Sequence, residues 1–393
     1  MTTATGTLPP GFSTTRGGTW VASMPVAVLV VVGAAGLVVA AVLAHRRARR
    51  RGVRARSPWL LWPGAVLALV LGVAIGVNAW VGYLPDVTAV RTWLAGQGIG
   101  TSPLTTAATR DGSATSGAVQ RVAVDAPAGL GVQNDPMWVY TPPGYDPARA
   151  RYPVLYLMHG SPGTPADWFA GGDAAATLDA LIDAGSIPPL VVVAPDLDGT
   201  DNTDTECLDS TNGGPQVETY LLDVVVPYVD AHYATVADRT GRAVGGMSSG
   251  GFCAVDLGLR HQDLFSAIAA IEPYTEPGDG GRAMLATQAD FDRHDAARYL
   301  PGLTFQEPMH VFVDIPGAAR DTISGRESAD LVRRLQDAGQ DVHVRTEPGQ
   351  GHTWTTARLA LPYALVDLAP DLAGSPASTR SATDVEKPSP APS

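Results

Sequence analysis

The residues best suited to covalent chemistry lie in the segment GMSSG, residues 246–250. A strand-like run, RAVG, precedes it, and a helix-like run, GFCAVDLGLRH, follows it. A serine between glycines at a strand-to-helix junction is typical of a nucleophile elbow, a tight turn that lifts the hydroxyl above the sheet. The segment therefore predicts Ser248 as a nucleophile. The alternative is an ordinary helix N-cap serine at a glycine turn.

A serine nucleophile needs a general base. Of the eight histidines, His352 alone follows the last predicted strand, in the loop EPGQGHTW before the last predicted helix. His310 and His343 lie in strand patterns, while His232 and His261 end helices, where the dipole favours a cation. We therefore predict His352 as the base. The alternative is a loop histidine that caps the following helix.

A carboxylate that orients the imidazole should arrive between the serine and the histidine in the sequence. The strand HVFVD is followed by IPGAARDTISGRESADLVRRL. Asp321 lies in the loop between this strand and the next helix, and we predict it as the orienting acid. Asp314 at the strand end and Glu327 near the helix start are competitors, and a solvated loop acid near an arginine is the alternative.

A tetrahedral intermediate needs two N–H donors. The amide of Ser249 follows the nucleophile at the start of a helix, whose dipole helps to bind an anion. The segment HGSPG ends an earlier strand, and Pro162 has no N–H, so Ser161 is the second predicted donor. The alternative for HGSPG is a plain turn.

A third predicted strand ends in an acidic segment, APDLDGTDNTDTECLDS, which superficially suggests calcium. The EF-hand register fails because Asp201 occupies the position that requires glycine. We expect a solvated acidic loop that lines the site, with no metal and no cofactor. Cys207 in this loop and Cys253 in the helix after the nucleophile both fall near strand carboxyl ends. They form either a disulfide, in an oxidising compartment, or two buried free thiols.

The elements that must position these residues are short apolar strands alternating with helices. This alternation over some 250 residues predicts a doubly wound, mainly parallel α/β sheet, in which ligands bind beyond the carboxyl ends of the strands. The predicted strands are 137–141, 154–158, 190–194, 243–247, 267–271, 310–313 and 342–346. The predicted helices are 174–184, 217–233, 249–261, 324–338 and 353–365.

The charges of the 393 residues are unevenly distributed. Lys and Arg number 27 against 39 Asp and Glu, a net charge of −12, yet residues 1–83 carry eight Arg and no acid, so the remainder carries −20. The acidic balance argues against a nucleic-acid partner, which needs clustered basic residues. It also disfavours anionic substrates through long-range repulsion.

Two uncharged apolar runs, residues 21–44 and 59–83, are each long enough to cross a bilayer as a helix. The loop HRRARRRGVRAR between them holds seven of the eight N-terminal arginines, so the positive-inside rule places it in the cytoplasm and both flanks outside. A cleaved signal peptide fits poorly because no basic region precedes the first run and a second run follows. We expect a multi-pass protein of the cell membrane with its catalytic domain on the extracellular side.

The sequence thus predicts five parts: an N-terminal tail (1–20), a two-helix membrane anchor (21–83), a Gly/Ser/Thr-rich linker (84–117), the catalytic domain (118–373) and a disordered tail rich in Pro, Ser and Ala (374–393).

Several motifs in order resemble the putative-esterase family of α/β-hydrolases, which includes esterase D, enterochelin-esterase-like enzymes and the antigen 85 mycolyltransferases. They are HGSPGTPADW, APD…CLDS…ETYLLDVVVPYVDAHY, GGMSSGGFCAVDLGLRHQDLF and GQGHTW, spanning about residues 120–370. The resemblance implies Ser248 as nucleophile, His352 as base, an acid at or near Asp321, and oxyanion amides at Ser161 and Ser249. One departure is that the acid follows Gly317 by four positions, where the family has two or three.

The family includes both hydrolysis and acyl transfer. We expect a serine esterase acting on an ester or acyl-lipid substrate through an acyl-serine intermediate. An acyltransferase that passes the acyl group to a sugar or lipid hydroxyl is the alternative, and a catalytically inactive envelope-binding domain is the third.

Overall fold

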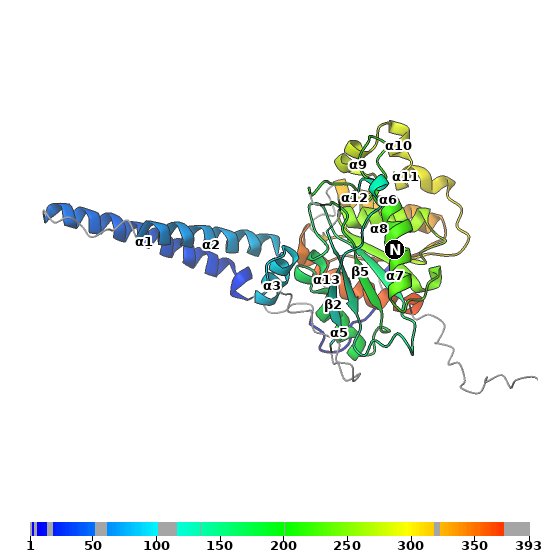
Figure 1. Ribbon diagram of the computed structural model, residues 1–393, viewed down its shortest axis with the longest axis horizontal. Helices are drawn as coiled ribbons and strands as arrows, with labels where there is room; N and C mark the ends of the chain where they lie inside the picture. The colour runs from blue at the N-terminus through cyan, green and yellow to red at the C-terminus, as the bar shows by residue number, and fades with distance from the viewer. Residues whose placement is uncertain are drawn as a thin grey trace, which may run out of the picture.

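The computed structural model describes residues 2–3, 6–13, 19–51, 61–100, 116–133, 135–199, 201–317 and 323–372. Asp321, the predicted tail 374–393 and part of the arginine-rich loop lie outside the described residues. The described chain comprises a long helical hairpin and an α/β domain, and the hairpin projects away from the domain (Figure 1).

The hairpin consists of α1 (Met24–Arg50) and α2 (Leu61–Val81), both long and apolar enough to cross a membrane. Small side chains form the contact between the helices: Ala27, Ala34 and Ala41, spaced by seven residues, are buried on α1. Gly72 lies opposite, where an added Cβ would come within 2.6 Å of a Val31 methyl carbon. Such small residues allow membrane helices to approach closely.

The sheet has nine strands in the order β1-β9-β8-β7-β6-β4-β5-β3-β2. All neighbours from β1 to β5 in this order are parallel, whereas β3 and β2 join antiparallel at one edge. The predicted doubly wound, mainly parallel sheet is confirmed. The strands are β1 (Thr2–Thr3), β2 (Ala118–Val122), β3 (Met137–Thr141), β4 (Val154–Met158), β5 (Val191–Ala194), β6 (Arg242–Met247), β7 (Ala267–Ile271), β8 (His310–Asp314) and β9 (Asp341–Arg345).

Helices cover both faces of the sheet, which explains why the central strands are apolar throughout. One face packs against α6 (Val217–Tyr220), α7 (Val226–His232), α8 (Ser249–Arg260) and α12 (Ile323–Asp337), with a π-helical turn (Leu221–Val225) between α6 and α7. The other face packs against α4 (Asp167–Ala170), α5 (Ala174–Asp183) and α13 (Trp354–Leu372). Short 3-10 turns are Trp20–Ala22, Ala128–Leu130, Arg239–Gly241 and Leu300–Gly302.

Three short helices that the sequence did not predict lie between β7 and β8. They are α9 (Gly278–Met284), α10 (Gln288–Asp292) and α11 (Ala296–Tyr299), grouped at the top of the domain in Figure 1. Met284, Leu285 and Phe291 from this insertion form a small apolar cluster with Leu208 and Phe252. The cluster fixes the insertion to α8 and to the acidic loop after β5.

The segment predicted as a linker contains a helix, α3 (Val87–Gly96). Asp86 caps it by accepting a hydrogen bond from the Ala89 amide at 2.8 Å. Its residues Ala89, Thr92 and Ala95, at a spacing of three, are buried. The Ala95 carbonyl accepts a hydrogen bond from Arg121 at 2.9 Å, so this part of the segment packs on the α/β domain.

The N-terminal segment before the hairpin also contacts the α/β domain. Leu8 and Phe12 pack against the apolar cluster that includes α13, and β1 pairs in parallel with β9. The two flanks of the hairpin therefore lie on the same side of it.

Candidate active site

Ser248 lies between β6 and α8 with φ 61° and ψ −121°, a strained conformation for a residue with a side chain. The flanking glycines make this turn possible. A Cβ on Gly246 would lie 2.2 Å from the Gly250 carbonyl oxygen, and a Cβ on Gly250 would lie 2.3 Å from that of Met158. The geometry is that of the predicted nucleophile elbow.

The loop after β4 lies beside Ser248. A Cβ on Gly160 would come within 3.5 Å of the Ser248 Cβ. The buried His159 ring orders this loop: its Nδ1 lies 2.8 Å from the Gly160 carbonyl oxygen, and its Nε2 accepts a hydrogen bond from the Leu197 amide at 3.1 Å. The loop thus brings Ser161 to the nucleophile.

His352 lies in the loop before α13, and its Nδ1 forms an ion pair with Oε2 of Glu272. The Glu272 side chain is 4% exposed, whereas that of His352 is 58% exposed. The Glu272 carboxylate raises the pKa of His352 above its ordinary value, and burial raises the pKa of Glu272. A carboxylate on Nδ1 leaves Nε2 of the imidazole for a hydroxyl partner.

The sheet register brings Glu272 next to Ser248. The two residues directly follow β6 and β7, which are parallel neighbours with Met247 opposite Ile271. The Ser248 amide donates to the Ile271 carbonyl at 3.0 Å. Neighbouring strands lie about 4.8 Å apart, so the backbone of Glu272, whose side chain pairs with His352, lies next to that of Ser248.

Glu272 is a further candidate for the orienting acid, which the sequence analysis did not consider. It satisfies the order of serine, acid and histidine, and it ends the strand next to the nucleophile strand. The available signal in the sequence was a carboxylate directly after the strand that follows the Ser248 strand along the chain.

The three acids considered from the sequence have different positions. Asp321 lies outside the described residues, so its role stays a prediction. Asp314 is fully buried and accepts a hydrogen bond from Arg345 at 2.7 Å, and burial raises its pKa to about 7 although Arg345 opposes the shift. Glu327 lines the pocket described next.

A pocket of about 710 Å³ contains Ser161, Ser248 and Ser249. Tyr274 and Gly278 also line it, and none of the described lining residues is basic. Its acidic lining residues are Asp204, Glu206, Glu276, Asp279 and Glu327. The pocket next to the nucleophile is therefore strongly acidic.

The acidic loop after β5 holds the hydroxyls of the two predicted oxyanion residues. Ser161 Oγ donates to Asp198 at 2.7 Å, and Ser249 Oγ donates to Glu206 at 2.9 Å. Tyr274 also donates to Glu206, at 2.6 Å. Burial raises the pKa of Asp198 to about 6 and that of Glu206 to about 8. The loop therefore contacts the two serines, but the expectation of a solvated loop is wrong for Asp198 and Glu206, which are buried where they accept these hydrogen bonds.

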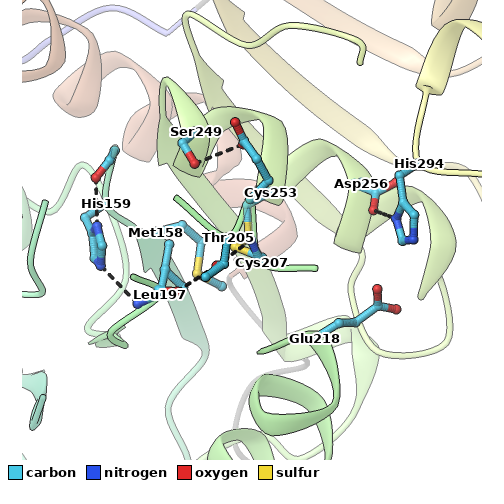
Figure 2. Close-up of a disulfide and its surroundings, with 12 residues drawn as sticks. Met158, His159, Leu197, Thr205, Cys207, Glu218, Ser249, Cys253, Asp256 and His294 are labelled. Carbon is cyan, nitrogen blue, oxygen red and sulfur yellow. Dashed lines mark hydrogen bonds and ion pairs between the residues drawn. A yellow bond between two sulfur atoms is a disulfide. The ribbon is translucent and has the colours of Figure 1, made fainter. Parts of the chain in front are cut away.

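Cys207 and Cys253 form a disulfide with a Cα–Cα distance of 5.7 Å. Figure 2 shows it close to Thr205 and below Ser249. It ties the acidic loop to the second turn of α8, so the two elements that carry Glu206 and Ser249 are covalently joined. Of the two sequence-based alternatives, the disulfide is the one formed.

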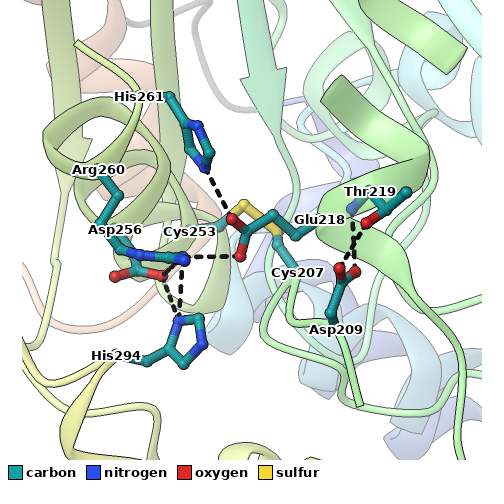
Figure 3. A network of polar contacts seen from close by, with 9 residues as sticks. All are labelled: Cys207, Asp209, Glu218, Thr219, Cys253, Asp256, Arg260, His261 and His294. Atoms are coloured by element: carbon teal, nitrogen blue, oxygen red, sulfur yellow. Dashed lines mark hydrogen bonds and ion pairs between the residues drawn. A yellow bond between two sulfur atoms is a disulfide. The ribbon is translucent and has the colours of Figure 1, made fainter. Parts of the chain in front are cut away.

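Beyond the disulfide, a polar network joins α6, α8 and the insertion (Figure 3). Arg260 contacts Glu218 at 2.7 Å and Asp256 at 3.1 Å, and Asp256 also contacts His294 at 2.7 Å. Glu218, Asp256 and His294 are close enough to hold a metal ion, but Arg260 already supplies positive charge there. A second such group, His310, Asp341 and His343, lies on β8 and β9, and Asp367 pairs with both of its histidines.

Part of the chain is similar in sequence to known esterases. A family model described as putative esterase matches residues 133–365. An uncharacterized protein of Corynebacterium glutamicum is 26% identical over 234 residues, 57% of this chain and 54% of that protein. An esterase of Mycobacterium tuberculosis is 33% identical over 136 residues, 34% of this chain and 27% of that protein. The chain thus spans about half of the first relative's length and about a quarter of the second's.

Among solved structures, a ferulic acid esterase superposes with a TM-score of 0.55 at 24% identity, covering 65% of this chain and 99% of the other. This likeness concerns the fold, and it confirms the predicted α/β-hydrolase architecture.

The orienting acid can be identified from the rate at which a fluorophosphonate probe labels the protein. Glu272→Gln should slow labelling at least about 100-fold, because the imidazole loses its orienting charge. Labelling requires neutral His352, so the rate rises with pH through the His352 pKa. In the wild type this midpoint lies above 6.5, and in the variant it should move down toward 6.5.

Asp321→Asn is the matched control and should label at the wild-type rate. If Asp321→Asn instead abolishes labelling while Glu272→Gln is unaffected, Asp321 is the orienting acid, as the sequence predicted.

Proposed function

The chain belongs to the putative esterase family, and from that membership we propose that it is a membrane-anchored serine hydrolase of carboxylic esters. The observation that carries the proposal is the strained Ser248 beside the His352–Glu272 pair. A positive φ at a non-glycine residue is costly, and such strain concentrates at active sites.

The proposed reaction proceeds through an acyl-serine intermediate. His352 takes the proton of the Ser248 hydroxyl as Oγ attacks the ester carbonyl carbon. The backbone N–H groups of Ser161 and Ser249 stabilise the resulting oxyanion. Collapse breaks the carbon–oxygen bond of the ester, and His352 returns the proton to the departing alcohol. A water molecule, deprotonated by His352, then attacks the acyl carbon, the bond from that carbon to Ser248 Oγ breaks, and His352 returns the proton to Oγ as the acid leaves.

Water is the acceptor that we propose because the His352 side chain is 58% exposed, so solvent reaches the base. Transfer to a sugar or lipid hydroxyl would proceed through the same intermediate. Product analysis with and without a glycan acceptor distinguishes the two: hydrolysis gives free acid in both cases, whereas transfer gives an acylated glycan.

Membrane anchoring is supported by the exposure of the hairpin's apolar side chains. Leu29 is 70% exposed, Leu67 61% and Trp80 78%, whereas the core helix of a soluble protein would bury such residues. Arg46, Arg47, Arg49 and Arg50 end α1 at the tip of the hairpin, far from the α/β domain (Figure 1). A cytoplasmic arginine cluster would place the domain outside, where a disulfide persists.

The nucleophile can be tested in the full-length membrane protein. Ser248→Ala should abolish fluorophosphonate labelling and lower hydrolysis of p-nitrophenyl acetate at least about 1,000-fold, because no other group replaces the attacking oxygen. Ser266→Ala, whose hydroxyl contacts the Arg242 carbonyl away from the pocket, should retain both activities. A wild-type protein that neither labels nor hydrolyses esters would instead be an inactive binding domain.

The acidic pocket predicts a charge preference. Acetylcholine should be hydrolysed with about three- to tenfold higher kcat/KM than its neutral isostere 3,3-dimethylbutyl acetate, and the ratio should fall as salt is added. Replacing Glu276 by Gln and Asp279 by Asn together should bring the ratio toward one. Equal rates for the two esters in the wild type at low ionic strength would contradict this expectation.

Topology can be tested with introduced cysteines, since both native cysteines are paired. In intact cells a membrane-impermeant maleimide should label the variant Ser389→Cys but not Gly52→Cys, and permeabilised cells should label both. Labelling of Gly52→Cys in intact cells would reverse the proposed orientation.

A further inference from the structure

The hairpin exit, the segment directly after α2, forms hydrogen bonds with the α/β domain. Tyr83 follows α2 by two residues, and its hydroxyl donates to Asp167 Oδ1 at 2.5 Å. Its ring centroid lies 6.1 Å from that of Trp354, with Gly171 against both rings. We call Tyr83, Asp167, Gly171, Trp354 and Arg358 the anchor junction.

Asp167 connects the junction to the oxyanion loop. Its carboxylate accepts hydrogen bonds from the Thr164 amide at 3.0 Å and the Thr164 hydroxyl at 2.9 Å. A Cβ on Gly163 would lie 3.0 Å from Asp167 Oδ2 and 2.9 Å from His159 Nδ1, so the turn packs tightly between the two side chains. Asp167 therefore holds the end of the loop that presents Ser161.

Trp354 and Arg358 connect the junction to the base. Both lie in the first turns of α13, immediately after His352. Arg358 Nη1 donates to the Gly171 carbonyl and to the Tyr83 carbonyl, the latter at 3.4 Å. The Trp354 ring packs edge-on against Trp168 with centroids 5.2 Å apart. These contacts with the hairpin exit thus fix the start of α13, which directly follows the loop that carries the His352 imidazole.

The outer part of the junction is fastened to α2 and to the 3-10 turn that precedes α1. Asn78 Nδ2 donates to the carbonyl of Leu84 at 2.8 Å and to that of Val21 at 2.9 Å. The Leu84 amide donates to Asn78 Oδ1 at 2.8 Å, and Thr19 donates to the Pro85 carbonyl at 2.7 Å. A displacement of the hairpin would therefore be transmitted to Tyr83.

We propose that Tyr83 is a positioning residue of the active site, which acts through Asp167 on the oxyanion loop and through Trp354 and Arg358 on the His352 loop. The hairpin is then part of the catalytic apparatus as well as an anchor. This inference rests on the proposed ester hydrolysis.

The test uses the full-length protein in membranes. Tyr83→Phe should lower kcat for p-nitrophenyl acetate about five- to twentyfold with KM changed less than about twofold, because alignment of reacting groups and not substrate binding is lost. Asp167→Asn should produce a similar loss, and the double variant should be no slower than the slower single variant. Arg358→Gln, which removes the bond to Gly171, should act in the same direction.

Tyr140→Phe is the matched control, because the buried Tyr140 hydroxyl also donates to a carboxylate, Asp179, at 2.8 Å. It should lower Tm about as much as Tyr83→Phe while leaving kcat unchanged. Equal kcat for Tyr83→Phe and Tyr140→Phe would overturn the inference. A wild-type protein without ester hydrolysis would overturn the proposed function instead, so the two failures are distinguishable.

Discussion

The site depends on the close approach of three backbone segments: the end of β4, the end of β6 and the start of α8. Gly246 and Gly250 leave no space for a Cβ, and this contact forces Ser248 into its positive φ. A strained residue of this kind costs on the order of 1–3 kcal/mol and persists only where its surroundings fix it. Because β4 and β7 are the two neighbours of β6, the same packing delivers the oxyanion loop on one side and Glu272 on the other.

Two acidic residues of the loop after β5 are hydrogen-bonded to the serines on either side of this turn. The Ser161 hydroxyl donates to Asp198, and the Ser249 hydroxyl donates to Glu206. These two bonds fix the serine side chains and do not involve the backbone N–H groups of either residue. Burying carboxylates is costly, and the raised pKa of Glu206 expresses that cost. The disulfide keeps the acidic loop against α8 despite the repulsion among its acids. The result is a pocket lined by carboxylates next to Ser248.

The sequence was most informative where structure is set locally. The predicted strands that precede Ser248 and His352, and the helix after Ser248, agree with the observed ones to within one residue at each end, since apolar runs and glycine turns determine them. The helix after His352 begins one residue from its predicted start but runs on to Leu372, beyond the predicted end at 365. The identity of the carboxylate near His352 was not predictable from chain order, because Glu272 and Asp321 both lie between the serine and the histidine. The short helices α9–α11 and α3 were missed because they are stabilised by contacts with distant segments, as in the cluster of Phe291 with Leu208.

The contacts of residues 78–86 restrict how the α/β domain can move relative to the hairpin. A domain on a flexible spacer samples many orientations, and ordering each spacer residue costs on the order of 1–2 kcal/mol. Here Asn78 is hydrogen-bonded to Leu84, Tyr83 to Asp167 of α4, and Asp86 to Ala89 of α3. These hydrogen bonds offset the entropy lost when the segment is ordered. A helix of 21 residues such as α2 is about 32 Å long, close to the thickness of a bilayer core. In the proposed membrane-anchored arrangement, a hairpin of this length, continuous with the contacts near the His352 loop, would fix the orientation of the pocket relative to the bilayer.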